Sequence, residues 1–128
     1  MPINVEWEND QKTLIRWDLL GHWTALELRQ TIQKSNEMIS EQDHTVNHII
    51  DLSQSDAVPG NIIGESRYAM RVMPKNLGRV VIITKHGFIE SVSKTLQRFA
   101  WFNNRVHVVQ SNAEALAYIW GQSSGTTG

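Results

Sequence analysis

The segment NHIIDLSQSDAVPG, residues 47–60, joins an apolar run to a polar loop that carries a proline near its end. Apolar residues occur at both odd and even positions of the run, which is typical of a strand covered on both faces of its sheet. The run stops at Asp51 and Ser53. Pro59 suits the first turn of a helix, where its missing N–H costs nothing. The segment therefore predicts a strand, a loop and a helix, as in a parallel α/β sheet.

The chain before this segment predicts a hairpin and a helix. Residues 3–7 and 13–20 alternate apolar with polar side chains, and the polar residues 8–12 separate them, which indicates two antiparallel strands. The polar face of the first strand places it at a sheet edge. Thr24 and Glu27 have the spacing of a capping box, so a helix is expected over residues 25–40.

The chain after the segment predicts further alternation of helices and strands. A helix is expected over residues 58–73, ended by Pro74, and the β-branched residues 79–84 predict a fully buried strand. Another helix (residues 88–102), a short strand (105–109) and a last helix follow. Ala113, Leu116, Ala117 and Trp120 are expected on the inner face of that last helix.

The expected fold is therefore a single α/β domain over residues 1–120, in the order β-β-α-β-α-β-α-β-α. Right-handed crossovers give a mostly parallel sheet with an antiparallel strand at its N-terminal edge, and the helices pack on it. Residues 121–128 contain mostly glycine, serine and threonine and are expected to form a disordered tail.

Composition narrows the classes of function. The chain has 128 residues, 12 basic and 13 acidic side chains, and no cysteine. The net charge of -1 gives no electrostatic reason to bind nucleic acid or an anionic membrane. Without cysteine or a His-Glu-x-x-His pattern, neither a metal nor another cofactor is expected. No apolar stretch is long enough for membrane insertion, and a cytoplasmic location is expected. The five tryptophans are expected mainly in the core or over sheet edges.

Three motifs, in order, resemble those of STAS domains, the family of sulfate transporters and anti-sigma factor antagonists. IIDLS (residues 49–53) resembles the family's strand ending in Asp-Leu-Ser. PKNLGRVVI (74–82) resembles a pattern of uncharacterised bacterial STAS-like proteins, and VVQSNAEAL (108–116) resembles the family's last strand and helix. The resemblance implies a non-enzymatic regulatory module that binds a protein partner and is a monomer or weak homodimer. The loop of residues 54–60 lacks the Asp-Ser-Ser-Gly of the antagonists, so the resemblance does not extend to a phosphorylated serine.

The carboxyl ends of the parallel strands are the expected place for a site, because loops diverge there and helices begin there. The residues predicted to contact a partner or ligand follow strands at this rim or lie on the next helix: Asp51, Ser53, Ser55, Asp56, Val58, Ile62, Arg67 and Lys85.

Two alternatives use the same rim. The first is a sensor that binds a small molecule or an anion near Ser53, Ser55 and Lys85. The second is a small enzyme that uses Asp51, Lys85 and His86 for acid–base chemistry.

Overall fold

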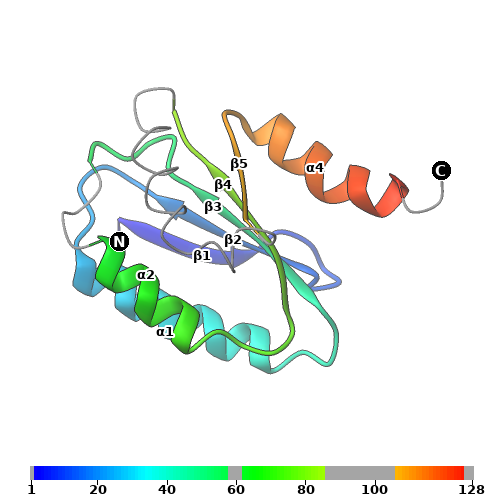
Figure 1. Cartoon of the computed structure of the whole chain (residues 1–128), viewed down its shortest axis with the longest axis horizontal. Coiled ribbons are helices and arrows are strands. Elements are labelled where there is room, and N and C mark those ends of the chain that lie inside the picture. Colours follow the sequence, from blue (N-terminus) through cyan, green and yellow to red (C-terminus); the bar gives the residue numbers. More distant parts are fainter. Residues whose placement is uncertain (1, 58–61, 86–105, 126–128) are drawn as a thin grey trace.

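A computed structural model describes residues 2–57, 62–85 and 106–125 of the chain (Figure 1). The five strands of the described part form one sheet in the order β1-β2-β3-β4-β5. They are β1 (Ile3–Trp7), β2 (Leu14–Leu19), β3 (Val46–Asp51), β4 (Leu77–Ile83) and β5 (Val106–Val109). β1 pairs antiparallel with β2, and all other pairs are parallel. The α/β fold with an antiparallel edge strand is therefore confirmed.

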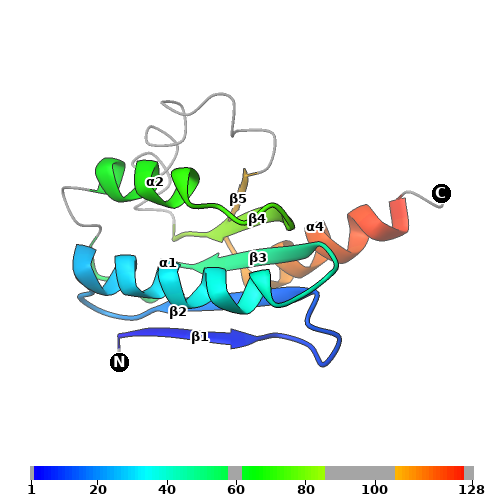
Figure 2. The ribbon, with the colours of Figure 1, turned by 90° about the horizontal axis from the view of Figure 1, so that it is seen from below.

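Helices cover both faces of this sheet. α1 (Ala25–Ser40) and α2 (Ile62–Arg71) lie side by side on one face, and α4 (Asn112–Gly125) lies on the other face (Figure 2). The expected helix over residues 88–102 lies outside the described residues.

Each face of the sheet has its own apolar core. The core under α1 and α2 contains Ile3, Trp17, Leu19, Trp23, Leu28, Ile32 and Leu52. The core under α4 contains Leu14, Ile49, Val81, Ile83, Val109, Ala115 and Ile119. Because both faces are covered, the central strands are apolar at both odd and even positions, as the segment at residues 47–60 indicated.

The inner face predicted for the last helix was wrong in part, because Leu116 packs against the core but the other three predicted residues do not lie on the buried face. Ala115 and Ile119 are the buried residues of α4, whereas Ala113 and Ala117 are exposed and Trp120 keeps 44% of its surface exposed. The buried stripe of α4 therefore runs through Ala115 and Ile119, and Leu116 lies at its flank. The backbone of α4 also continues to Gly125, past Trp120, where the disordered tail was expected to begin.

Local capping explains where α1 and α4 begin. The Thr24 hydroxyl accepts the backbone N–H of Glu27 at 3.1 Å, and the Glu27 carboxylate accepts the N–H of Thr24 at 2.9 Å. The predicted capping box is therefore confirmed. At α4, the Ser111 hydroxyl accepts the backbone N–H of Glu114 at 3.1 Å.

The motif at residues 74–82 has a structural role at the end of the sheet opposite the rim. The Asn76 side chain donates to the carbonyl oxygens of Ile39, Gln42 and His44 at 2.8–3.2 Å. It thereby supplies hydrogen-bond donors to carbonyl groups at the end of α1 and in the loop after it. A Cβ at Gly78 would stand 2.5 Å from the Asn47 Oδ1 atom and 2.7 Å from the Thr45 Cγ2 atom, so a larger residue here would displace these side chains. This motif therefore joins α1 to β4.

Candidate functional site

The loop after β3 is held by Ser55, which is completely buried. Its hydroxyl donates to the Leu19 carbonyl oxygen at 2.7 Å and accepts the indole N–H of Trp23 at 2.9 Å. The backbone next to it pairs with Gly21, whose N–H bonds the Gln54 carbonyl and whose carbonyl accepts the N–H of Asp56. Ser55 therefore ties the end of β2 to the loop after β3 and is not available to a partner or ligand.

Asp51 is held by a basic side chain that the sequence analysis did not connect with it. The guanidinium of Arg16 on β2 donates to the Asp51 carboxylate at 2.6 Å and to Asp18 at 3.1 Å. The same guanidinium also donates to Asn112 at the start of α4, at 2.6 Å. Burial alone would lower the pKa of Arg16, but the hydrogen bond to Asp18 and the nearby carboxylates raise it. Asp51 is therefore a structural ion-pair partner under α4.

Ser53 belongs to the same arrangement. Its backbone N–H and its hydroxyl both donate to the Asp51 carboxylate, at 2.8 and 2.5 Å. This is the local side-chain-to-backbone bonding by which aspartate shapes a turn. With Arg16 on one oxygen of Asp51 and Ser53 on the other, the carboxylate has its charge neutralised and both oxygens occupied.

Four of the exposed residues at the rim or on the helix that follows it, His22, Asp56, Arg67 and Lys85, carry ionisable side chains, and we call them the rim surface. His22 and Asp56 are 80% and 57% exposed and lie 3.2 Å apart as a histidine–carboxylate pair. Lys85 follows β4, and Arg67 is on the exposed side of α2. β2, β3 and β4 are parallel, so the residues that follow them share one edge of the sheet.

α2 is fixed to α1 and therefore presents Arg67 in a defined position. Arg29 on α1 donates to the Glu65 carboxylate at 3.1 Å and lies 3.9 Å above the Tyr68 ring. Asn36 donates to the carbonyl oxygen of Val72 at 3.0 Å. These contacts along both helices hold α2 in one position on the sheet.

One buried histidine stands apart from the rim. His48 on β3 is 5% exposed and makes an edge contact with Trp17, with ring centroids 4.4 Å apart. Burial lowers the pKa of His48 to about 3. Trp17 Nε1, Ser35 Oγ and His48 Nε2 are buried with no hydrogen-bond partner in the described part of the chain. His48 is therefore a neutral core residue at ordinary pH.

The eight predicted contact residues separate into groups. Asp51, Ser53 and Ser55 are occupied by structural bonds, whereas Asp56, Arg67 and Lys85 are exposed. Val58 lies outside the described residues, as does the side chain of Ile62, whose backbone opens α2. His86, the third residue of the enzyme alternative, lies outside them too.

Sequence reasoning missed Arg16 and His22. Arg16 had a detectable signal, because it is a cation flanked by apolar residues on a strand, and such a charge needs an acid nearby. His22 had none, since its contact with Asp56 depends on the pairing of Gly21 with the loop.

Comparisons with known proteins found no match for the chain. No family model matches it, and neither the search of curated proteins nor that of solved structures finds a match. Within residues 2–57, 62–85 and 106–125, no helix has the length and apolarity needed to cross a bilayer. The same residues contain no group of three or more histidine, aspartate or glutamate side chains arranged to hold a metal ion.

Proposed function

We propose that this chain is a non-enzymatic, STAS-like regulatory module that binds a protein partner through the rim surface. The observation that carries the proposal is the division of the rim: Ser55 and Asp51 are occupied internally, whereas His22 and Asp56 are exposed beside them. An exposed patch of both charges suits recognition of another protein, because complementary charges at an interface fix partner and orientation.

The occupied carboxylate of Asp51 argues against the enzyme alternative. Acid–base catalysts need an accessible group with a pKa tuned by its surroundings. In the described residues, Arg16 and His48 have shifted pKa values, and both shifts have structural causes. Asp51, the acid of the enzyme alternative, has an arginine on one carboxylate oxygen and a serine on the other.

The anion-sensor alternative has weaker support from the same geometry. Ser55 is completely buried and Ser53 donates its hydroxyl to Asp51, so neither hydroxyl is directed to a ligand.

The resemblance to STAS domains supports a regulatory role, and the geometry argues against a phosphorylated Ser55. A kinase must reach the hydroxyl, but Ser55 is buried and both of its side-chain hydrogen bonds are to core groups. Regulation through this rim would therefore act by direct contact, with no charge added at Ser55.

Affinity capture with matched variants tests the proposal. Asp56→Arg and Arg67→Glu should each remove a specific partner from the captured proteins, because each reverses one charge of the rim surface. Asp43→Arg and Arg71→Glu are the matched controls, since both residues are exposed, Asp43 lies in the loop at the opposite end of the sheet and Arg71 ends α2. If the controls lose the partner and the rim variants keep it, the rim surface is not the contact site.

A further inference from the structure

The outer edge of β1 has unpaired backbone groups. β1 pairs with β2 on one side, and no strand of the described part pairs with its other side. The Leu20 N–H donates to the Pro2 carbonyl at 2.7 Å, and the Glu8 N–H donates to the Leu14 carbonyl at 2.8 Å. Since these groups alternate along an antiparallel strand, the even-numbered residues bond β2. Ile3, Val5 and Trp7 therefore direct their N–H and C=O groups outward.

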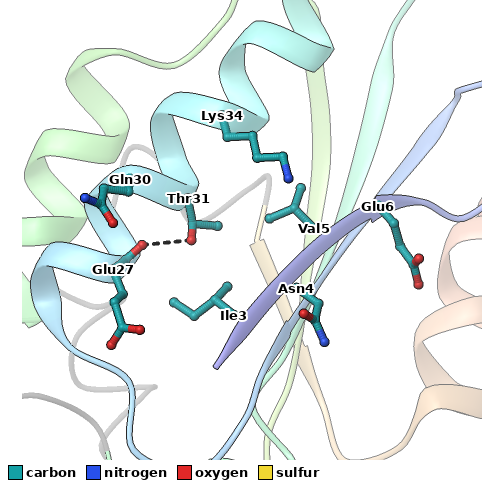
Figure 3. Close-up of a pocket in the computed structure, with 8 residues that line it drawn as sticks. All are labelled: Ile3, Asn4, Val5, Glu6, Glu27, Gln30, Thr31 and Lys34. Atoms are coloured by element: carbon teal, nitrogen blue, oxygen red, sulfur yellow. Dashed lines mark hydrogen bonds between the residues drawn. The ribbon is translucent and has the colours of Figure 1, made fainter. Parts of the chain in front are cut away.

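A groove of about 350 Å³ runs along this edge between β1 and α1 (Figure 3). α1 connects two parallel strands to which β1 is antiparallel, so β1 and α1 run in the same direction. Glu27 accordingly lies beside Ile3 at one end of the groove, and the Lys34 ammonium points toward Val5 nearer the other end (Figure 3). The helix side of the groove is thus acidic at one end and basic at the other.

We propose that the occupant of this edge is a second copy of the chain, paired antiparallel through β1 about a twofold axis at Asn4. That axis places Ile3 opposite the partner's Val5 and Asn4 opposite the partner's Asn4. The outward N–H and C=O groups of Ile3 and Val5 then form about four hydrogen bonds between the chains. The two sheets join into one continuous sheet.

The charges of α1 agree with the same axis. The twofold turns the partner's α1 antiparallel, so Glu27 comes opposite the partner's Lys34, and Lys34 opposite the partner's Glu27. Both ends of the groove then meet the opposite charge. A foreign peptide strand could pair with the backbone groups of β1 alone. The charges of α1, in contrast, are complementary to those of a second copy of α1.

The other face of β1 also tolerates this pairing. Glu6 lies opposite the partner's Pro2 and not opposite the partner's Glu6, so two acids do not meet in a cross-strand pair. The strand is short, with 5 residues. An interface of one short strand and one side of α1 falls below the roughly 1,200 Å² of stable complexes. We therefore expect a weak dimer that forms at high protein concentration.

Sedimentation velocity of the full chain, from about 10 µM to about 1 mM, tests the pairing in the range of weak dimers. The wild type should shift from monomer to dimer across this range. Val5→Pro should stay monomeric, because proline removes a donor that faces away from β2 and is tolerated on an edge strand. Val5→Thr keeps the N–H and is the matched control. A wild type that stays monomeric throughout, or a dimer that survives Val5→Pro, would overturn the proposal.

Charge reversal separates a self-paired edge from other dimers and does not depend on the proline variant. Glu27→Lys and Lys34→Glu should each weaken dimerisation by about tenfold, because each turns two attractive contacts into repulsive ones. The double variant should regain most of the affinity, although it still lacks the Glu27 cap of α1. Equal weakening in the double variant and in Glu27→Lys would overturn the proposed axis.

Discussion

The buried imidazole of His48 makes the stability of the fold depend on pH in a calculable way. Its pKa is about 3 in the folded protein and 6.5 when it is exposed to water. Above pH 6.5 the ring is neutral in both states and does not affect the pH dependence. Between pH 6.5 and 3 the unfolded chain binds a proton that the folded chain does not, so stability falls as the pH falls.

The size of this loss follows from linkage. Each pH unit below 6.5 costs about 1.4 kcal/mol, so the loss from pH 8 to pH 5 is about 2 kcal/mol. This value changes little for any folded-state pKa below about 4, because the folded form is then unprotonated at pH 5. His48→Phe keeps the ring beside Trp17 and removes the titration.

Urea unfolding at pH 8, 7, 6 and 5, followed by tryptophan fluorescence, measures the effect. The other acids and histidines titrate in both proteins, so the difference in unfolding free energy between His48→Phe and wild type isolates His48. This difference should grow by about 2 kcal/mol in favour of the variant from pH 8 to pH 5. A His48→Phe difference that stays constant within about 0.5 kcal/mol would refute a buried neutral His48.

Further predictions concern the rim, the glycines and the ion pairs under α4. Ser55→Ala should lower the free energy of unfolding by about 1–3 kcal/mol, because it leaves a buried indole N–H unpaired, whereas Ser53→Ala should lower it by less than about 1 kcal/mol. Urea titrations of the two variants that show equal losses would contradict the role of Ser55. The new methyl group of Gly64→Ala on α2 meets open space and should stabilise the fold by about 1 kcal/mol, whereas that of Gly78→Ala meets the Thr45 and Asn47 side chains and should destabilise the fold. Melting temperatures of the two variants that shift in the same direction would contradict this. Arg16→Gln should destabilise by about 2–3 kcal/mol at pH 7, because it leaves partly buried carboxylates without their cation. Urea titrations that show no loss would refute this.

Sequence periodicity predicted the fold because each element depends mainly on local pattern. The alternation of residues 3–7 and the capping box at Thr24 act over a few residues, and both are present in the structure. The inner face of α4 failed because the helix carries apolar residues around much of its circumference, so spacing alone did not distinguish Trp120 from Ile119.

The rim was harder to predict because its residues are occupied by contacts distant in sequence. Asp51 and Ser55 sit in a polar loop and look available, but Arg16 and Trp23 on other elements bind them. A strand-end pattern marks where polar side chains gather. It does not reveal which of them are already used by the fold.

The central claim, that the exposed rim surface is the contact site of a partner, is tested most directly by site-specific photo-crosslinking in cells that produce the chain. A photoreactive amino acid in place of Asp56 should give one defined adduct with another protein. The same replacement at Asp43, an exposed acid at the opposite end of the sheet, should give none. Adducts from position 43 with none from position 56 would contradict the claim.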